Sequence, residues 1–397
     1  MNIIQDIFKE FDNRREELEI SLEEMRQEIA VYKDKLLLYG AGSAGIAFLY
    51  FLRRIGLEPR FFLDADRSKE GKECEGVKII TPDRVVEIAG EDALVIVCIN
   101  TDGKRYCKSF DEALRIGGHH AVYDKLREAG CKNIIDYTFF RRCHEFFQKE
   151  KYNAPSCSDV GLMIKHKNEI ADVYEWLSDE QSKDVFEKIL RFRLLDDTLE
   201  IPTMTQEQQY FEYGFYERRT DDIFVDCGAF NGISFKTFLS ENNNQFEKYY
   251  GLEPDCVNWN KFMKYKEQLP EEIQKKMYCI RKAAWENNEG IRFYSLHGPG
   301  SFAADIGKEN VETISIDAML NGQRASYIKM NIEGSEKQAL KGAEETVRKY
   351  KPRLAVAGYH RTEDFWKIPL MMKTYREDYK IYLRSYMNHI SFVYYGV

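Results

Sequence analysis

The stretch IFVDCGAFNGIS, residues 223–234, decides the fold of this chain. Its apolar start predicts a buried strand, Asp226 lies near the end of that strand, and Gly228 and Gly232 allow a sharp turn into a helix. The next apolar strand closes with Glu253 in GLEPD, about 27 positions later, where an acid can accept hydrogen bonds from ribose hydroxyls. Together these features predict a Rossmann-like sheet that binds a ligand containing a nucleoside.

Alternating strands and helices continue from this stretch to the C-terminus. The strands predicted there are DIFVDC, KYYGLEP, MYCIRKA, YIKMNI, RLAVAGY, YKIYLRSY and ISFVYYGV. Strands that are separated by helices favour a parallel sheet with helices on both faces. Only MNH separates the last two strands, so we predict a hairpin whose final strand runs antiparallel to its neighbour. Residues 221–397 are therefore expected to form one α/β domain.

A second alternation of strands and helices covers residues 35–145. Gly40, Gly42 and Gly45 form GxGxxG directly after the strand KLLLYG, and Asp64 ends the next strand, about 24 positions on. The first two glycines let a phosphate approach the backbone, and the helix N-terminus offers it free N–H groups. We predict a second nucleotide site here. The alternative is a Rossmann-shaped structural domain whose site is empty or degenerate.

The stretch from LLLYGAGSAGIAFLYFLRRIG to RFFLDADRSKEGKECEGVKIITPD resembles a recurring bacterial module. Similar modules precede sugar-modifying domains, including some nucleotide-sugar acetyltransferases, in which they bind the nucleotide sugar. The resemblance implies that residues 35–140 bind either a nucleotide sugar or NAD(P).

The C-terminal part of the chain, residues 165–397, resembles the FkbM methyltransferase family. The matching pieces, in the family's order, are QYF at 209–211, VDCGAFNG at 225–232, GLEPD at 251–255, KAAWENNEG at 282–290, TISID at 313–317, YIKMNIEGSEKQALKGAEE at 327–345, KPRLAVAGYH at 351–360, ED at 363–364 and YKIYLRSY at 379–386. The resemblance implies a class I methyltransferase fold and methyl transfer from S-adenosylmethionine to an oxygen acceptor, often in glycan or polyketide-related biosynthesis.

The same resemblance assigns residues around the expected cofactor crevice. Those implied to contact the cofactor are Asp226, Gly228, Ala229, Asn231, Gly232 and Glu253, with Ala283, Ala284 and Trp285 beside the adenine. At the end of the fourth strand, Lys329, Asn331 and Glu333 alternate along the chain and can all face the reacting centre. Core packing is the competing interpretation for Trp285, and a structural ion pair is the competing interpretation for Lys329 and Glu333.

One position departs from the family. Asn331 stands where the family usually has aspartate, and an amide cannot act as a general base. His360 follows the fifth strand at the same expected edge, and a neutral imidazole can accept a hydroxyl proton near pH 7. We therefore predict catalytic roles for His360, Lys329, Asn331 and Glu333, with His360 as the base and with no metal ion.

Aromatic residues are abundant, with 25 Tyr and 25 Phe, so any single one is more readily a core residue than part of a site. Tyr327, Tyr359, Trp366 and Tyr382 are interpreted either as a wall on which a sugar ring stacks or as core residues.

Chain length predicts more than one domain, because 397 residues exceed a single ordinary core. We expect an N-terminal helix within residues 1–34, a Rossmann-like domain over 35–145, a helical connector over 146–220 and the methyltransferase domain over 221–397. The narrow apolar stripe of the N-terminal helix is typical of a coiled-coil seam, which would form a homo-oligomer, or of a helix packed on its own domain.

Charge and cysteine content narrow the classes of partner. The net charge of -8 argues against a protein that binds duplex nucleic acid. Nine cysteines without a CxxC pair indicate reduced thiols. The start, MNIIQDIFKEFDNRREELEI, lacks the apolar core of a signal peptide, and no apolar stretch is long enough to span a membrane. We expect a cytoplasmic protein that acts on a small molecule or a glycan.

Three functions remain open at this point. The first is an S-adenosylmethionine-dependent O-methyltransferase that acts on a sugar, nucleotide sugar or glycan. The second is a nucleotide-sugar-binding or assembly protein whose methyltransferase half is inactive, and Asn331 is its best support. The third is an NAD(P)-dependent oxidoreductase that uses Gly40, Gly42 and Gly45, although no YxxxK-type catalytic pair accompanies the first sheet.

Overall fold

The computed structural model describes residues 3–99, 109–116, 121–143, 159–195, 197, 199–205, 209–212, 214–215, 217–296, 300–305, 307–387 and 391–397. The chain divides into two compact units. Unit 1 comprises residues 1–167 and 188–200, and unit 2 comprises residues 168–187 and 201–397. The division of the chain at residues 34, 145 and 220 stays a prediction.

Unit 1 is built on a six-stranded sheet with strand order β3-β4-β2-β1-β5-β6. Its strands are β1 (Leu36–Tyr39), β2 (Phe61–Leu63), β3 (Glu73–Cys74), β4 (Val77–Ile80), β5 (Leu94–Val97) and β6 (Asn133–Asp136). All pairings are parallel except that of β3 with β4. The side chains of β1 and β5 are buried throughout, as expected for central strands of a parallel sheet covered on both faces.

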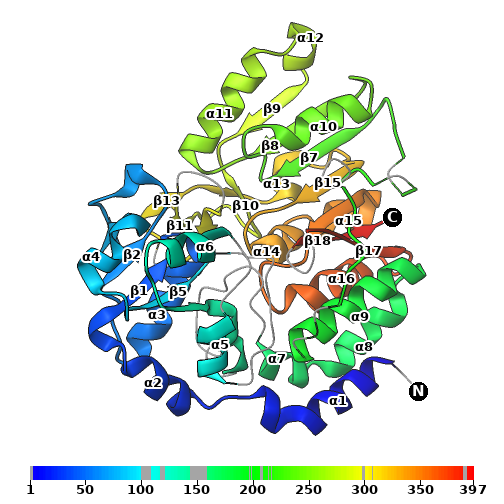
Figure 1. The fold of residues 1–397 in the computed structure, drawn as a ribbon. Helices are drawn as coiled ribbons and strands as arrows, with labels where there is room; N and C mark the ends of the chain where they lie inside the picture. The colour runs from blue at the N-terminus through cyan, green and yellow to red at the C-terminus, as the bar shows by residue number, and fades with distance from the viewer. Residues whose placement is uncertain are drawn as a thin grey trace. The chain divides into compact units, whose positions relative to one another are not determined.

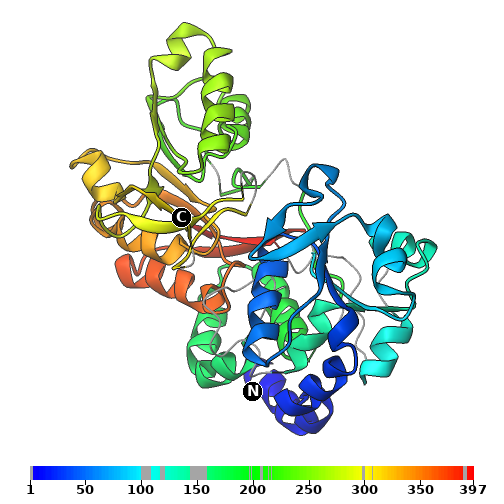
Figure 2. The ribbon, with the colours of Figure 1, turned by 90° about the vertical axis from the view of Figure 1, so that its left-hand side faces the viewer.

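The helices of unit 1 are α1 (Ile3–Leu18), α2 (Leu22–Ala30), α3 (Ser43–Arg54), α4 (Val85–Ala89), α5 (Phe110–Ile116), α6 (Ala121–Glu128) and α7 (Val160–Lys165). Of these, α3, α4 and α6 lie beside the sheet, and α1 lies away from it (Figures 1 and 2). We predicted one N-terminal helix over residues 1–34, but the structure has two separate helices there, α1 and α2. The second helix starts anew at a capping box, in which the Ser21 hydroxyl accepts from the Glu24 backbone N–H and the Glu24 carboxylate accepts from the Ser21 N–H.

Unit 2 is built on a seven-stranded sheet with strand order β17-β18-β16-β15-β7-β8-β9. The strands are β7 (Ile223–Cys227), β8 (Lys248–Leu252), β9 (Met277–Ile280), β15 (Tyr327–Met330), β16 (Arg353–Ala357), β17 (Ile381–Met387) and β18 (Ser391–Gly396). The five strands from β16 to β9 are parallel, and β18 lies antiparallel between β16 and β17. The prediction of a class I methyltransferase sheet with an antiparallel last strand is confirmed, while residues 388–390 of the closing turn lie outside the described residues.

Helices of unit 2 follow most of its strands. They are α8 (Lys167–Trp176), the first part of α9 (Glu180–Leu195), α10 (Ile233–Glu241), α11 (Cys256–Glu267), α12 (Glu271–Gln274), α13 (Ile316–Leu320), α14 (Glu336–Lys341), α15 (Glu344–Tyr350) and α16 (Asp364–Tyr375). Two small sheets that we did not predict lie between β9 and α13 in the chain. They are β10 (Ala283–Ala284) with β14 (Thr313–Ile314), and the meander β11 (Ile291–Tyr294), β12 (Phe302–Ala303) and β13 (Glu309–Val311).

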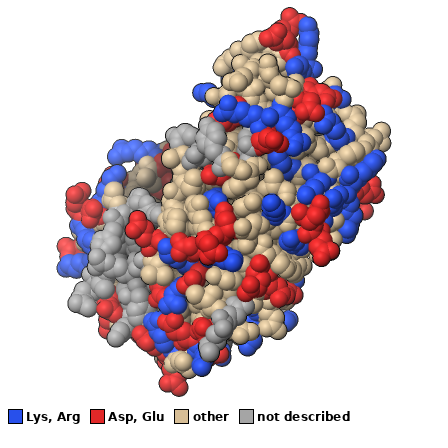
Figure 3. All heavy atoms as spheres, turned by 90° about the vertical axis from the view of Figure 1, so that its right-hand side faces the viewer, with Lys and Arg blue, Asp and Glu red and all other residues tan. Residues whose placement is uncertain are grey.

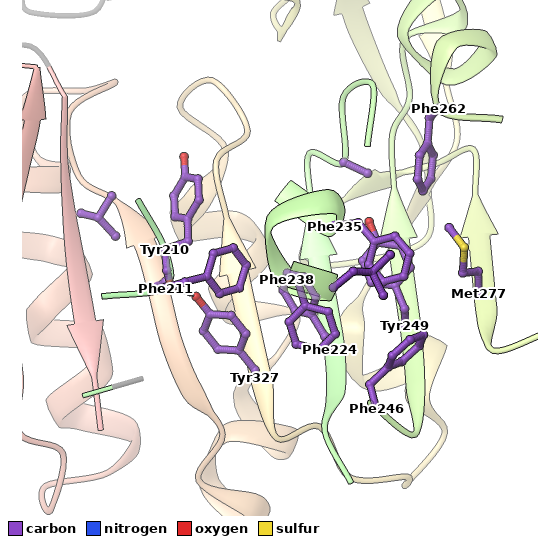
Figure 4. Close-up of a cluster of buried hydrophobic side chains, with 14 of the residues drawn as sticks. Tyr210, Phe211, Phe224, Phe235, Phe238, Phe246, Tyr249, Phe262, Met277 and Tyr327 are labelled. Atoms are coloured by element: carbon purple, nitrogen blue, oxygen red, sulfur yellow. Dashed lines mark hydrogen bonds between the residues drawn. The ribbon is translucent and has the colours of Figure 1, made fainter. Parts of the chain in front are cut away.

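The core of unit 2 is rich in aromatic rings. Phe224 of β7 stacks on Tyr327 of β15 with ring centroids 5.0 Å apart. The ring centroids of Tyr249 of β8 and Phe235 of α10 are 3.9 Å apart. Figure 4 shows these rings running across neighbouring strands of the sheet. Because such large rings fill the space between the sheet and the helices, they fix how the helices pack on β15, β7 and β8, whose ends carry the site described below.

The surface drawn in Figure 3 carries acidic and basic side chains side by side. No helix within the described part of the chain has both the length and the apolar character needed to cross a membrane.

Candidate active site

A cavity of about 280 Å³ lies at the C-terminal ends of β7, β8 and β15 in unit 2. This is the edge at which open α/β sheets bind their ligands. The predicted site residues that line it are Gly228, Glu253, Ala283, Ala284, Lys329, Asn331 and Glu333. Asp226, Ala229, Asn231, Gly232, Trp285 and His360 are not among its lining residues.

The glycine turn after β7 is shaped by contacts that exclude a side chain. Gly228 has φ +82°, and a Cβ atom at this position would lie 2.2 Å from the backbone oxygen of Asn331. Gly232, the N-cap of α10, has φ +90°, and a Cβ there would lie 2.4 Å from the ring of Tyr265. Both positions therefore require glycine for conformation and for space. Asn231 serves this turn through its side-chain oxygen, which accepts a hydrogen bond from the Ile233 N–H at 3.2 Å.

Asp226 and Lys329 form a buried ion pair beneath the turn. Their side chains are 0% and 3% exposed, and Lys329 Nζ lies 2.9 Å from Asp226 Oδ1. Lys329 also donates to the backbone oxygens of Cys227 at 3.3 Å and Gly228 at 2.8 Å. The second oxygen of Asp226 accepts from the Ser234 hydroxyl at 2.5 Å and the Tyr249 hydroxyl at 2.9 Å. The alternative that we considered was an ion pair between Lys329 and Glu333. In the structure Lys329 instead pairs with Asp226, and this pair ties β15 to the glycine turn.

Glu253 lies at the end of β8, on the wall of the cavity. Its Oε2 accepts a hydrogen bond from the Phe230 N–H at 2.9 Å, and its Oε1 accepts from the Asp255 N–H at 3.0 Å. Burial raises the pKa of Glu253 to about 7, although these two backbone donors act in the opposite direction. The carboxylate is therefore held in one orientation and is partly protonated near neutral pH.

The meander β12-β11-β13 supplies one end of the cavity, with Ile291, Phe293 and Ala303 beside the predicted Ala283 and Ala284. These side chains form an apolar surface suited to a flat ring. The meander residues were not predicted, because their strands are short and follow the charged segment ENNEG.

The meander is fastened to the start of α11 by one acid. Asp255 Oδ2 accepts from the hydroxyl of Ser295 at 2.5 Å and of Ser301 at 3.0 Å, while Oδ1 caps α11. Trp285 lies just beyond Ala284, is half-buried, and is outside the lining.

The loop after β15 presents Asn331 and Glu333 at the other end of the cavity. Tyr359 donates a hydrogen bond from its hydroxyl to Asn331 Oδ1 at 3.1 Å, and this leaves the amide N–H groups of Asn331 as the donors available to a ligand. Glu333 has φ +54°, a left-handed conformation that is uncommon for residues other than glycine, and its side chain is 29% exposed. Burial raises the pKa of Glu333, and the nearby His360 charge only partly offsets this.

Glu336 holds the Glu333 loop in shape. Its two carboxylate oxygens accept from the backbone N–H groups of Ile332 at 2.7 Å and Gly334 at 3.0 Å. The guanidinium of Arg361 donates to the Gly334 oxygen at 2.6 Å from the other side. The loop is therefore fixed at three backbone atoms, which offsets the strain of its left-handed residues.

His360 lies behind this loop and is only 3% exposed. Its Nδ1 lies 2.8 Å from Glu336 Oε1, and its Nε2 lies 3.7 Å from Glu333 Oε2. Burial by itself lowers the pKa of His360, but the two glutamates raise it to about 9. At neutral pH the side chain is therefore an imidazolium, which has no free lone pair to accept a proton.

The four aromatic residues considered as a sugar-stacking wall lie outside the lining of the cavity. Tyr327 and Trp366 are 1% and 0% exposed and belong to the core. Tyr382 stacks on Phe215 with ring centroids 4.7 Å apart, and Tyr359 contacts Asn331 from behind. The core interpretation of Tyr327 and Trp366 is confirmed.

Among the lining residues that were not predicted, two share an unusual backbone conformation. Tyr210 of the QYF segment and Phe230 of the glycine turn line the cavity, and both have positive φ, +75° and +53°. Strained backbone of this kind gathers at functional sites. Together with Glu333, these residues place three left-handed non-glycine residues around one cavity.

The GxGxxG turn of unit 1 also has glycines with distinct roles. Gly40 has φ +100°, and a Cβ at Gly45 would lie 1.9 Å from the Gly40 oxygen, so the turn requires both glycines internally. Gly42 has φ -116°, and a Cβ there would meet no atom within 4 Å. Asp64 closes the turn, because it accepts from the Ala41 N–H at 3.2 Å and from Lys69 Nζ at 2.8 Å.

Comparison with known proteins decides the family of the C-terminal half. Residues 226–393 match the family model described as the methyltransferase FkbM domain. The chain carries an FkbM-family methyltransferase domain. The cavity, the glycine turn after β7, Glu253 and the Glu333 loop all lie within the matched residues of this FkbM domain.

One solved structure shares the fold over the whole chain. The methyltransferase FkbM from Methylobacillus flagellatus KT matches with a TM-score of 0.67 and 21% identity over 100% of this chain and 99% of that chain. The match to Aeropyrum pernix fibrillarin with bound S-adenosyl-L-methionine covers 47% of this chain and 72% of that chain, at 9% identity and a TM-score of 0.31. No curated protein that was compared matches the chain.

Proposed function

We propose that the FkbM domain transfers a methyl group from S-adenosylmethionine to a hydroxyl of a sugar, nucleotide sugar or glycan. The observation that carries the proposal is one cavity with an oriented carboxylate, Glu253, toward its β8 side and a polar pair, Asn331 and Glu333, at the end of β15. A methyltransferase needs both a nucleoside-binding end and a reacting end, and this cavity provides the side chains for each.

The residues present fit S-adenosylmethionine. Glu253 uses one lone pair of each oxygen on backbone N–H groups, so each oxygen can still accept from a ribose hydroxyl. Ala283, Ala284 and Phe293 offer an apolar surface to the adenine. Gly228 brings the backbone close to the methionine portion. When bound, the cofactor supplies an electrophilic methyl group on a sulfonium.

An acid beside the glycine turn can bind the ammonium group of the cofactor, but we assign Asp226 a different role. Its carboxylate is completely buried, does not line the cavity, and accepts hydrogen bonds from Lys329, Ser234 and Tyr249. We therefore propose that Asp226 and Lys329 stabilise the glycine turn after β7 and that neither of them contacts the cofactor's ammonium group.

We propose Glu333, in place of His360, as the group that accepts the acceptor's proton. Glu333 lines the cavity and has a raised pKa, which brings a carboxylate closer to the pH at which a general base is most effective. The charged His360 holds Glu336 and Glu333 in position instead. Asn331 donates from its amide to an oxygen of the acceptor and fixes its direction.

Methyl transfer to a panel of acceptors tests this assignment. The full chain is incubated with methyl-labelled S-adenosylmethionine and with UDP-sugars, free sugars and oligosaccharides, and label in the product is measured. We expect transfer to at least one hydroxyl compound and a loss of about 100-fold or more in Glu333→Gln, the scale of losing a general base. Full turnover in Glu333→Gln, with loss in His360→Gln, would return the base role to His360.

The alternative of an inactive methyltransferase half rests on Asn331. The variant Asn331→Asp separates the two functions, because it restores the carboxylate that the family usually has at this position. We expect the wild-type chain to be active and Asn331→Asp to keep that activity. An inactive wild type that becomes active as Asn331→Asp would favour the binding or assembly function.

For unit 1 we propose a nucleotide ligand of its own, a nucleotide sugar or NAD(P), at Gly40, Gly42, Gly45 and Asp64. The support is Gly42, whose ordinary φ and open surroundings give it no internal reason to be glycine. Thermal unfolding of the full chain with UDP-sugars, NAD+ and NADP+ tests the proposal. Stabilisation that Gly42→Val removes is expected, and no stabilisation by any of them would leave unit 1 a structural domain.

A further inference from the structure

Tyr210 is fixed in an unusual backbone conformation at the wall of the cavity. Its φ is +75°, in the left-handed region that non-glycine residues rarely occupy. Its backbone N–H donates to the hydroxyl of Tyr395 at 3.0 Å, and its carbonyl oxygen accepts from the hydroxyl of Tyr327. Two tyrosines from β18 and β15 thus hold the residue in place, so the direction of its side chain is set by the sheet.

The hydroxyl of Tyr210 has no hydrogen-bond partner within the part of the chain that the structure describes, although the residue is 9% exposed and lines the cavity. Figure 4 shows this hydroxyl pointing away from the rings of the aromatic core. Burial raises the pKa of Tyr210 well above its ordinary value, so the group stays a neutral phenol at all physiological pH. A neutral phenol has lone pairs to offer a ligand, but it is not a base.

The position of Tyr210 along the cavity follows from its neighbours. Its ring centroid lies 5.2 Å from Lys329 Nζ, and that ammonium is bonded to the backbone oxygens that begin the glycine turn. Tyr210 therefore belongs to the β7–β15 side of the cavity, whereas Glu253 belongs to the β8 side. In the cofactor, the sulfonium joins the ribose to the methionine portion, so it lies between groups bound at these two sides.

We propose that Tyr210 is a positioning residue for the sulfonium methyl group, an inference that rests on the proposed binding of S-adenosylmethionine. The methyl C–H bonds of a sulfonium are polarised, and a phenolic oxygen accepts weak C–H···O bonds from them. This contact exists only while the methyl group is present, so the hydroxyl should distinguish S-adenosylmethionine from S-adenosylhomocysteine.

Calorimetric titration of the full-length protein tests this inference without a known acceptor. S-adenosylmethionine, S-adenosylhomocysteine and sinefungin, whose protonated amine replaces the S-methyl group, are titrated into wild type and Tyr210→Phe. We expect Tyr210→Phe to weaken the first and the third by about two- to fivefold while leaving S-adenosylhomocysteine unchanged. Tyr379→Phe is the matched control, because it also removes a buried tyrosine hydroxyl of unit 2, bonded to the Pro352 oxygen and outside the cavity lining.

The outcomes separate this inference from the proposed function. Equal weakening of all three ligands in Tyr210→Phe, or no change in any of them, would overturn the positioning role. If the wild-type protein binds none of the three, the proposed function itself fails. Thermal unfolding of both variants shows whether each remains folded, and a Tyr379→Phe variant with the same selective loss would also contradict the role of Tyr210.

Discussion

At the scale of single residues, Glu253 makes cofactor binding depend on pH. Its pKa is raised to about 7 in the free protein, and hydroxyl donors from a ribose would favour the ionised carboxylate. We therefore expect S-adenosylmethionine to bind more tightly above pH 7 than below it and to release protons at pH 7. Calorimetry in two buffers of different ionisation enthalpy measures this release. Glu253→Gln should abolish it, and equal heats in both buffers for wild type would contradict the role of Glu253.

His360 gives a second pH dependence, this time in stability. Its folded-state pKa of about 9 lies above the unfolded value of about 6.5. Its charge therefore stabilises the fold fully below pH 6.5, and this contribution disappears as the pH rises through 9. Urea unfolding of wild type and His360→Gln should differ by roughly 2–3 kcal/mol at pH 6 and converge toward pH 9. A difference that grows with pH would show that His360 is neutral when buried.

At the scale of elements, the glycine turn after β7 and the loop after β15 depend on each other. A side chain at Gly228 would meet the Asn331 oxygen at 2.2 Å and would also need φ +82°. Gly322 has φ +80° but open surroundings, so Gly322→Ala isolates the cost of the backbone conformation. In urea unfolding we expect Gly228→Ala to lose about 3 kcal/mol or more and Gly322→Ala about 1 kcal/mol. Equal losses of stability in the two variants would mean that a Cβ at Gly228 does not clash with the Asn331 oxygen.

The same elements show what the sequence could predict. The apolar runs predicted strands of the large sheets in both units, and these strands are present. Glu253 also lies at the expected strand end. Both features could be predicted because they depend on local sequence pattern. The partner of Lys329 was not predictable, since Asp226 lies 103 positions away and Glu333 offered an acid only four positions along the chain. The charge of His360 was not predictable either, because it depends on Glu336. The Glu336 Oε1 atom lies 2.8 Å from His360 Nδ1 only in the folded chain. Tyr210 was missed as a site residue because no local rule marks a left-handed tyrosine.

At the scale of the whole molecule, the two units carry glycine turns of similar sequence pattern, but their glycines are required for different reasons. In unit 1, Gly45 is required by packing, because its Cβ would lie 1.9 Å from the Gly40 oxygen, whereas Gly42 has open space. Gly45→Ala should therefore destabilise the protein by about 3 kcal/mol or more, and Gly42→Ala should change stability by less than about 0.5 kcal/mol. Denaturant unfolding measures both. A costly Gly42→Ala would give Gly42 a structural role and weaken the case for a ligand there.

We propose above all that the cavity of unit 2 binds S-adenosylmethionine with Glu253 at the ribose. This is tested by calorimetric titration of S-adenosylmethionine into the full-length wild type and Glu253→Ala. We expect one site per chain in the wild type and a loss of roughly 1–3 kcal/mol of binding free energy in the variant, the cost of leaving ribose hydroxyls without a partner. Absence of binding to the wild type, or equal affinity in a folded Glu253→Ala variant, would contradict it.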